Sequence, residues 1–245
     1  MRIAIGLSMT FALGATAVGY SSEESTVIVE SDGWRLAGNL RLPEDTGEPV
    51  PAVVLLHGAA RNREAYSELA LQLASRGIAS LRLDLRAHGE STNRGRFAPG
   101  EEGALALLEG TPRDVVAAHR YFETLGRIDA ARIAFVGASY SGEAMAEAGR
   151  IHRKGRAYVA LSPGSLSDES IAEIDPSGIP WLYVRSRDEI RVTEVTEAVQ
   201  RNSHAEIWIV PGSGHGSDLA LRSADSTQRS RVDRSFTDGT SRPGR

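Results

Sequence analysis

One stretch of the sequence predicts a strand that turns into a helix within about four residues. The apolar run 132–136 leads into a turn of mostly small residues, and Ala- and Glu-rich helix formers continue from Gly142. A reversal this sharp forces its central residue, Ser139, into strained backbone torsions and requires small neighbours so that strand and helix can approach closely. It also lifts the Ser139 hydroxyl above the end of a sheet and aims helix N–H groups at the same point.

The turn reads Gly137-x-Ser139-x-Ser141, with Ser141 where the usual pattern of a strained serine turn has glycine. Serine is the next smallest residue that fits. An ordinary junction between a strand and a helix has a similar composition, and five-residue patterns of this kind arise by chance. The assignment of Ser139 as a nucleophile therefore depends on its partners elsewhere in the chain.

Apolar runs alternate with helical segments along most of the chain, which predicts an α/β fold with a mainly parallel sheet covered on both faces. Asp32-Gly33 separates two alternating runs and predicts an antiparallel hairpin at the N-terminal sheet edge. The short span between Leu161 and Pro180 leaves no room for a large lid domain. The expected inner strands are 52–56, 78–83, 132–136, 157–161, 179–184 and 205–210.

The chain of 245 residues is long enough for one substantial domain, which we place at residues 21–221. Residues 1–20 have the pattern of a signal peptide with cleavage near Ala17, which predicts a secreted or periplasmic protein. The segment is too short and too broken by Gly and Ser to form a stable membrane-spanning helix, although an uncleaved anchor is the alternative. We expect no stable membrane insertion of the mature chain. The polar residues 222–245 are expected to be a disordered tail.

Composition argues against several other chemistries. The net charge of −4 gives no reason to expect nucleic acid as a partner, and the absence of Cys excludes thiolate metal sites. The sequence contains neither a His-Glu-x-x-His motif nor a phosphate-binding loop ending in Gly-Lys. We therefore expect no metal and no cofactor.

Reactive residues follow four of the expected strands: His57-Gly58-Ala59, Ser139-Tyr140, Asp188 and His215. Loops at the carboxyl ends of parallel strands meet at one edge of the sheet, where ligands bind. A serine hydroxyl becomes a nucleophile when an imidazole takes its proton, and the imidazole needs a carboxylate behind it. Unrelated folds use these three residues in different chain orders, and the order serine, acid, histidine is characteristic of one of them.

On these residues the chain resembles the α/β-hydrolase superfamily, in particular the dienelactone-hydrolase-like and serine-aminopeptidase-like esterases and peptidases, from about Val27 to His215. The resemblance implies that Ser139 is the nucleophile, Asp188 the acid and His215 the base. It also implies that the N–H groups of Ala59 and Tyr140 form an oxyanion hole. Glu189 competes for the role of the acid, but Asp188 fits the family position better.

The other histidines receive structural interpretations. His57 and His88, each beside a glycine at a strand end, are expected to be structural, and His119, His152 and His204 are expected at the surface. The family normally closes with an apolar helix after the base. Here Gly216 is followed only by Leu219, Ala220 and Leu221 before the polar tail. This predicts a curtailed helix or a diverged C-terminus, and one poorly covered face of the sheet.

These features together predict a serine hydrolase that cleaves carboxylic esters through an acyl-enzyme intermediate, acting on a small-molecule ester or a short peptide. A serine peptidase or amidase with the same triad is the nearest alternative, because the loops that choose the leaving group have no readable signature. A non-catalytic binding protein on the same scaffold is a second alternative, favoured if the segment after Gly216 does not hold His215 in place.

Overall fold

The computed structural model describes residues 22–222, except for the side chains of residues 202, 221 and 222. The signal peptide expected over residues 1–20, and all of the expected tail beyond Arg222, lie outside the described residues. The fold is a mainly parallel sheet with helices packed against both faces, as expected from the alternation of apolar runs and helical segments.

The sheet has eight strands in the order β1-β2-β4-β3-β5-β6-β7-β8. Strands β1 and β2 are antiparallel to each other, and β2 is antiparallel to β4, while every other neighbouring pair is parallel. The carboxyl ends of the parallel strands therefore lie along one edge of the sheet. The strands are β1 (Glu23–Ser31), β2 (Trp34–Leu42), β3 (Val50–Leu56), β4 (Ala79–Leu83), β5 (Ile128–Ala138), β6 (Tyr158–Leu161), β7 (Trp181–Ser186) and β8 (Glu206–Val210).

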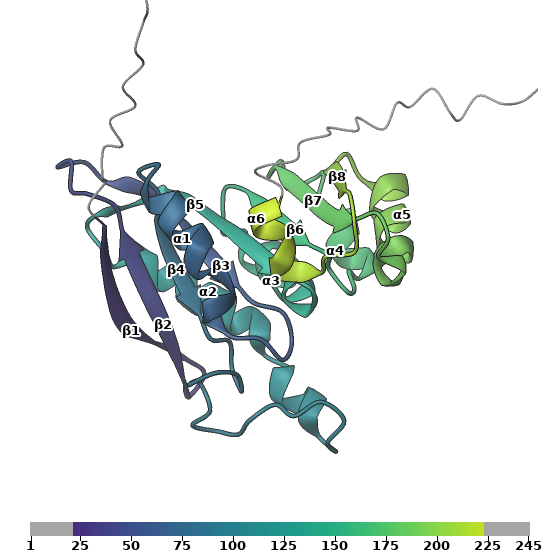
Figure 1. Ribbon diagram of the computed structural model, residues 1–245, viewed down its shortest axis with the longest axis horizontal. Helices are drawn as coiled ribbons and strands as arrows, with labels where there is room; N and C mark the ends of the chain where they lie inside the picture. Colours follow the sequence, from purple (N-terminus) through teal and green to yellow (C-terminus); the bar gives the residue numbers. More distant parts are fainter. Residues whose placement is uncertain (1–21, 223–245) are drawn as a thin grey trace, which may run out of the picture.

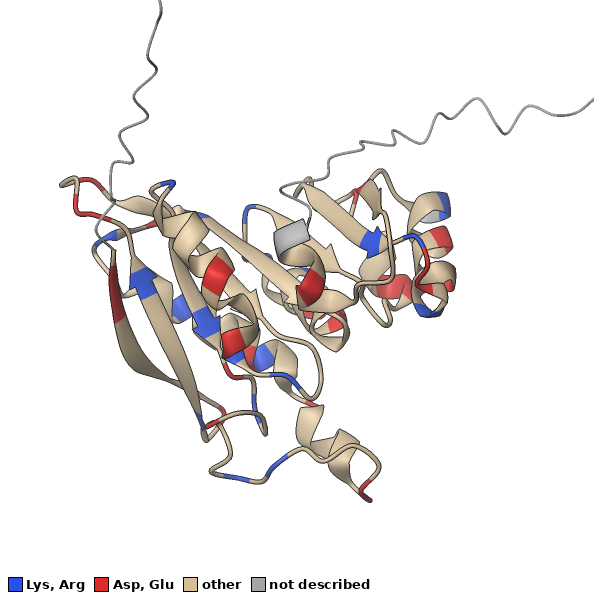
Figure 2. Cartoon of the chain, in the orientation of Figure 1, with Lys and Arg blue, Asp and Glu red and all other residues tan. Residues whose placement is uncertain are grey.

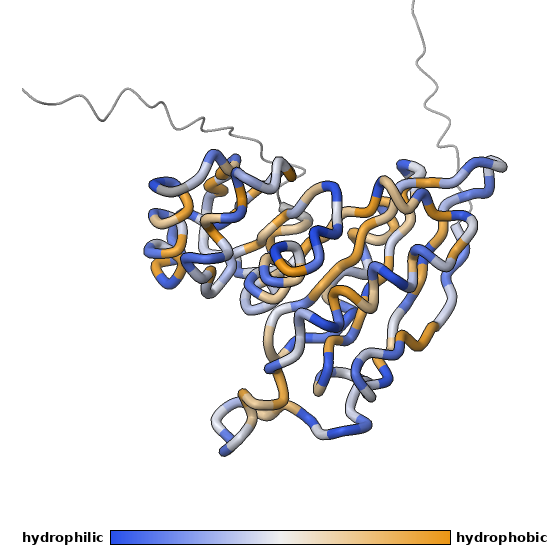
Figure 3. Tube along the Cα trace, turned by 180° about the vertical axis from the view of Figure 1, so that it is seen from behind, coloured by the Kyte–Doolittle hydropathy of each residue, from blue (hydrophilic) through white to orange (hydrophobic). Residues whose placement is uncertain are grey.

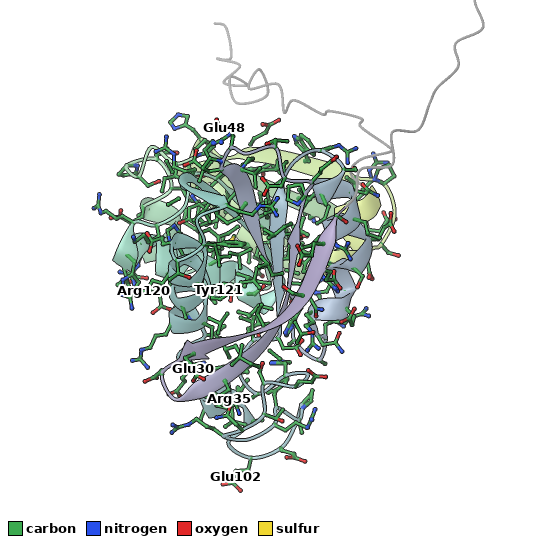
Figure 4. All side chains as sticks on the ribbon, turned by 90° about the vertical axis from the view of Figure 1, so that its left-hand side faces the viewer. Glu30, Arg35, Glu48, Glu102, Arg120 and Tyr121 are labelled. Carbon is green, nitrogen blue, oxygen red and sulfur yellow. The ribbon has the colours of Figure 1, made fainter. Side chains whose placement is uncertain are left out.

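The N-terminal hairpin forms at the predicted place because two residues supply left-handed backbone torsions. Asp32 has φ 52° and Gly33 has φ 78°, as a two-residue hairpin turn with the twist of its strands requires. Next to the turn, Glu30 lies opposite Arg35, with 3.7 Å between their charged groups. Figure 4 shows this pair at the tip of the hairpin.

Helices cover the two faces unequally. Figure 1 shows α1 and α6 in front of the sheet, with α2 and α3 behind it. The central strands carry the long apolar stretches of the trace (Figure 3), as strands covered on both faces require. The helices are α1 (Ser67–Ala74), α2 (Thr111–Glu123), α3 (Tyr140–His152), α4 (Asp168–Ala172), α5 (Thr193–Asn202) and α6 (Leu219–Arg222), and the 3₁₀ turns are η1 (Arg63–Tyr66), η2 (Ala104–Leu108), η3 (Ile190–Val192) and η4 (Gly216–Asp218).

The segment after His215 folds as η4 and then as helix α6, which reaches Arg222, the last described residue. Leu219 is fully buried and belongs to the smaller of two core clusters, together with Tyr66 and Ala70 from the segment containing α1. The strand side chains on that face are only partly buried at Val136, Val159, Leu182 and Trp208. Within residues 22–222, this face of the sheet is therefore incompletely covered.

The loop between β4 and α2 contains η2 and projects from the carboxyl edge of the sheet, with Leu105 75% exposed. Glu102 lies at its far end (Figure 4). Acidic and basic residues are interspersed over the view in Figure 2 rather than gathered on one face. Within residues 22–222, no helix has the length and apolar character that a membrane crossing demands.

One sequence expectation for the histidines was wrong. His119 lies on α2 but is only 3% exposed, and its ring stacks on Phe135 of β5 with centroids 6.0 Å apart. It faces the core because α2 packs this side against the sheet. His152 and His204 are exposed as expected, and His204 pairs with Asp175 at 2.6 Å.

Candidate active site

Ser139 occupies the predicted turn between β5 and α3 in a strained conformation. Its torsions are φ 54° and ψ −121°, a combination that residues with a side chain rarely adopt. Two backbone hydrogen bonds hold it there: its N–H donates to the carbonyl of Leu161 on β6 at 3.0 Å, and its carbonyl accepts from Gly142 N at 3.0 Å. The side chain remains partly exposed. Strain of this kind, held by neighbouring structure, is typical of functional sites.

The small residues around Ser139 have the packing roles that the sequence predicted. A Cβ atom on Gly137 would lie 2.9 Å from the carbonyl oxygen of Ser141, so strand and helix approach too closely for any side chain there. Ser141, in the position usual for glycine, is fully buried. Its hydroxyl accepts from Ala138 N at 2.8 Å and lies 3.0 Å from the Leu56 carbonyl, so it connects the turn to the end of β3.

The loop after β3 lies directly against this turn. A Cβ atom on Gly58 would lie 3.3 Å from the Cβ of Ser139. His57 is fully buried; its Nδ1 lies 2.8 Å from the Gly58 carbonyl and its Nε2 accepts from Leu85 N at 3.1 Å. These partners assign the proton to Nδ1, and burial lowers the pKa of His57 to about 4 despite the hydrogen bond to Gly58. His57 thus holds the loop as a neutral structural residue, as expected.

The two expected oxyanion donors directly follow Gly58 and Ser139 in the sequence. Ala59 follows Gly58 in the loop after β3, and Tyr140 is the first residue of α3, where the N–H has no acceptor within the helix. The ring of Tyr140 is fixed by stacking on His88, with centroids 5.7 Å apart and planes at 20°. Helix α3 therefore directs its N-terminal dipole at the position beside the serine.

His215 and Glu189 form a close hydrogen-bonded pair between Nδ1 and Oε1. The Glu189 side chain is 7% exposed and the His215 side chain 47% exposed, so the carboxylate is buried behind an imidazole that is open to solvent. The other carboxylate oxygen, Oε2, accepts from the Ser162 hydroxyl at 2.6 Å. Ser186 donates to the Gly214 carbonyl and ties the histidine loop to the end of β7.

The structure corrects the expected pairing of Asp188 with His215. Asp188 is exposed, and its N–H donates to the Gly212 carbonyl at 3.1 Å, while Arg187 N donates to Val210 at 2.8 Å. These backbone bonds extend the pairing of β7 with β8 by two residues and leave the next side chain, that of Glu189, facing His215. The sequence ranked the two carboxylates wrongly because they are adjacent, and only the backbone path decides which one is buried.

Ser139 and His215 are neighbours through their loops. A Cβ on Gly216 would lie 3.4 Å from the Cβ of Ala138 and 4.0 Å from the backbone nitrogen of Ser139. Within residues 22–222 no hydrogen bond joins the Ser139 hydroxyl to His215. Such bonds are often long without substrate and tighten in the complex. Four of the five expected site residues, Ser139, Tyr140, Ala59 and His215, thus lie on segments that meet here.

Two features that sequence reasoning did not include also border the site. Ser162 follows β6, and the loop after it brings Gly164 to the serine, where an added Cβ would lie 3.7 Å from Ser139 Oγ. The available signal was the position of Ser162-Pro163-Gly164 immediately after a buried strand.

A cavity of about 210 Å³ lies away from this site. Its lining includes Arg153, Tyr158 and Trp181, near the amino ends of β6 and β7.

Metal ligation has no support in the part of the chain that the structure describes, where no three His, Asp or Glu side chains are grouped to hold an ion. The arrangement around Ser139 instead combines a strained hydroxyl, neutral N–H donors and a buried carboxylate behind an imidazole. These are the groups that acyl transfer to a serine uses.

The chain is 34% identical over 160 residues to uncharacterised proteins from two strains of Mycobacterium tuberculosis, a match that covers 65% of this chain and 51% of theirs. The chain therefore spans about half the length of these curated relatives.

Solved structures with the same fold include Est1E from Butyrivibrio proteoclasticus with ferulic acid bound (20% identity, TM-score 0.63, covering 77% of this chain and 90% of that one). A dienelactone hydrolase from Anabaena variabilis is 20% identical with a TM-score of 0.62, covering 79% and 88%. A dienelactone hydrolase-like promiscuous phosphotriesterase from metagenomic libraries is 21% identical with a TM-score of 0.64, covering 79% and 82%.

The family model described as "Alpha/beta hydrolase family" matches residues 53–195, a range that includes the loop after β3, the Ser139 turn and Glu189. The match runs from β3 into α5. By this match and by the arrangement of its strands, the chain belongs to the alpha/beta hydrolase family.

Proposed function

We propose that the protein is a serine hydrolase that cleaves carboxylic esters through an acyl-enzyme intermediate. Ser139 is the nucleophile, His215 the general base and Glu189, in place of the expected Asp188, the carboxylate behind the base. The observation that carries the proposal is the convergence of three strand-end loops. One presents Ser139 in strained torsions, one carries His215, and one places Glu189 against His215 Nδ1.

The proposed reaction begins when the Ser139 oxygen attacks the ester carbonyl and its proton passes to His215 Nε2. The contact with Glu189 assigns the proton of the neutral ring to Nδ1, which leaves Nε2 free to accept. The negative charge that develops on the carbonyl oxygen is stabilised by the N–H groups of Ala59 and Tyr140, at about 3 kcal/mol for a single donor.

Collapse of the tetrahedral intermediate breaks the bond to the leaving alcohol, which takes the proton from His215. A water molecule then attacks the acyl-enzyme while His215 accepts one of its protons. His215 passes this proton to the Ser139 oxygen as the second intermediate collapses, which restores the hydroxyl and releases the carboxylic acid, whose own proton is lost to solvent. Glu189 stays ionised throughout and stabilises the imidazolium of His215. Over the complete cycle, the protein groups return to their starting protonation.

The substrate class we propose is a small-molecule ester. Membership in the alpha/beta hydrolase family supports hydrolysis. The structural relative with ferulic acid bound motivates including esters of aromatic acids among the compounds tested. The loop between β6 and β7 contains only the five-residue helix α4, so no large domain from this loop covers the site, which suits access by small or extended esters.

Labelling with a fluorophosphonate probe tests the nucleophile. The wild-type protein should be labelled at Ser139, and Ser139→Ala should not be labelled under the same conditions. Labelling that persists in Ser139→Ala, or a wild-type protein that resists the probe at all concentrations, would contradict the proposal and favour a binding protein. Ser177→Ala is a matched control, because Ser177 lies between α4 and β7, before the amino end of β7 and therefore at the opposite edge of the sheet from the loops of the site.

Substrate profiling tests the reaction. We expect hydrolysis of p-nitrophenyl acyl esters, and little or no cleavage of aminoacyl anilides. A preference for the anilides would replace the esterase by a peptidase with the same residues.

We also propose that the protein is exported, on the strength of the N-terminal 20 residues. N-terminal sequencing of protein recovered from cell fractions should then find a chain that begins near Val18 outside the cytoplasm. An intact Met1 on protein confined to the cytoplasm would refute export without bearing on the chemistry.

A further inference from the structure

We propose that Ser162 is a positioning residue, whose hydroxyl holds the Glu189 carboxylate in the orientation that His215 requires. This inference rests on the proposed function, because it assigns a role within the same site. Ser162 comes directly after β6, the strand between β5, which leads to Ser139, and β7, which leads to Glu189. It therefore occupies the sheet edge between the nucleophile and the acid.

The contacts of Glu189 divide between its two oxygens. Oε1 faces Nδ1 of His215, and Oε2 accepts the Ser162 hydroxyl at 2.6 Å. An ionised carboxylate can only accept hydrogen bonds, so the Ser162 oxygen must be the donor. Ser162 has no exposed surface, which excludes water from competing for this bond at the serine.

A glutamate side chain has three rotatable bonds, and a contact at one oxygen leaves the carboxylate free to turn about the last of them. The second contact from Ser162 fixes the plane of the carboxylate and keeps Oε1 towards the imidazole. Serine also provides a neutral donor. A cation at this position would compete with the imidazolium of His215 for the same negative charge, whereas a hydroxyl leaves that charge available to His215.

The backbone at Ser162 gives independent support. Its φ is 45°, a left-handed conformation that glycine adopts readily and serine does not. The conformation is held by a hydrogen bond from Ser162 N to the Val184 carbonyl at 2.7 Å. Ser139 and Ser162 therefore follow neighbouring strands and share positive φ values of 54° and 45°. Strained residues maintained by surrounding structure concentrate at functional sites.

Two substitutions separate the hydroxyl from the backbone strain. Ser162→Ala removes the hydroxyl and keeps the strain, whereas Ser162→Gly removes both. If the hydroxyl positions Glu189, both variants should lose activity on p-nitrophenyl esters, by about 10- to 100-fold in kcat with KM changed by less than about threefold. Ser162→Gly should be at least as resistant to thermal unfolding as Ser162→Ala.

The matched control is Ser170→Ala. Ser170 is also a buried serine that donates to a glutamate, with its hydroxyl 3.0 Å from Glu143 Oε1, but it lies on α4. It should lose a comparable hydrogen bond and keep wild-type kcat. Equal losses in Ser170→Ala and Ser162→Ala would show a general effect on folding and overturn the proposal. Wild-type kcat in either Ser162 variant would overturn it as well.

A proton NMR measurement gives a readout that needs no turnover. A histidine Nδ1–H shared with a buried carboxylate gives a far-downfield resonance, identified here by its absence in His215→Gln. We expect this resonance to shift or broaden in Ser162→Ala and to stay unchanged in Ser170→Ala. An unchanged resonance in Ser162→Ala would refute the positioning role.

The same measurements distinguish failure of the positioning role from failure of the proposed function. If wild-type protein hydrolyses esters through Ser139 but Ser162→Ala matches it in kcat and spectrum, the positioning role fails and the esterase stands. If the wild-type protein is inert but the resonance responds to Ser162→Ala, the hydrolase proposal fails and the structural link between Ser162, Glu189 and His215 remains.

Discussion

Glu189 and His215 face each other across the loops that follow β7 and β8, with Oε1 of the carboxylate against Nδ1 of the ring. The carboxylate is buried and the imidazole is half exposed, so one edge of the ring is anchored and the other remains available to a substrate. Because Nδ1 is occupied, our proposal makes Nε2 the nitrogen that exchanges a proton with Ser139. This pairing gives the acid role in our proposal to Glu189.

Exchanging the carboxylates for amides tests that assignment. Glu189→Gln should lower kcat/KM on p-nitrophenyl esters by about 10³- to 10⁴-fold, because an amide cannot stabilise the imidazolium and can select the wrong tautomer of His215. The adjacent Asp188→Asn is the matched control and should change kcat/KM by less than about threefold, because that side chain is exposed. The opposite ranking would return the acid role to Asp188.

Adding one methyl group beside the nucleophile should change acyl-chain preference. Alanine fits at position 164 without backbone strain, and its Cβ would lie 3.7 Å from Ser139 Oγ, an ordinary contact that removes room for substrate. We expect Gly164→Ala to lower kcat/KM for a p-nitrophenyl hexanoate about tenfold more than for the acetate. Gly126→Ala, where an added Cβ meets no atom within 4 Å, should leave both values unchanged. Equal effects on both esters would show that Gly164 does not line the acyl site.

The neutral state of His57 should make stability depend on pH. Burial lowers its pKa in the folded protein from 6.5 to about 4, so the unfolded chain binds a proton first as the pH falls. The free energy of unfolding therefore has its full value from this group above pH 6.5. It decreases as the pH falls towards 4, by roughly 3 kcal/mol at most. Urea denaturation at several pH values should show a shallower decline for His57→Gln than for the wild type. Parallel curves for His57→Gln and the wild type would mean that His57 takes up its proton equally in the folded and unfolded protein.

Ser141 should contribute to stability through its buried hydroxyl. Ser141→Ala leaves Ala138 N without its acceptor in the core and should lower the free energy of unfolding by about 1–3 kcal/mol. The control Ser75→Ala removes an exposed hydroxyl that bonds the Gln72 carbonyl and should change it by less than about 0.5 kcal/mol. Urea unfolding curves measure both. An unchanged midpoint for Ser141→Ala would show that the hydroxyl is not needed where glycine is usual.

The sequence determined the elements of the fold because their signals are local. Buried strands appear as continuous apolar runs, and the observed β3 and β4 each differ from the expected runs by no more than two residues at either end. Asp32 and Gly33 specify a hairpin turn through their own backbone preferences. The alternation of strands and helices then restricts the chain to a parallel sheet, and the small residues around Ser139 encode the strained turn.

The tertiary structure decided what local pattern could not. Asp188 and Glu189 are adjacent acids, and nothing in the sequence separates their roles. The backbone hydrogen bonds of residues 187 and 188 to Val210 and Gly212 leave Asp188 exposed and bury Glu189. Ser162 is brought to Glu189 by the order of strands in the sheet, across 27 residues of chain. His119 was misplaced for the same reason, because the face of a helix that packs inward depends on its neighbours. A sequence specifies which strands and turns form, but which side chains meet is decided by how those elements align and pack.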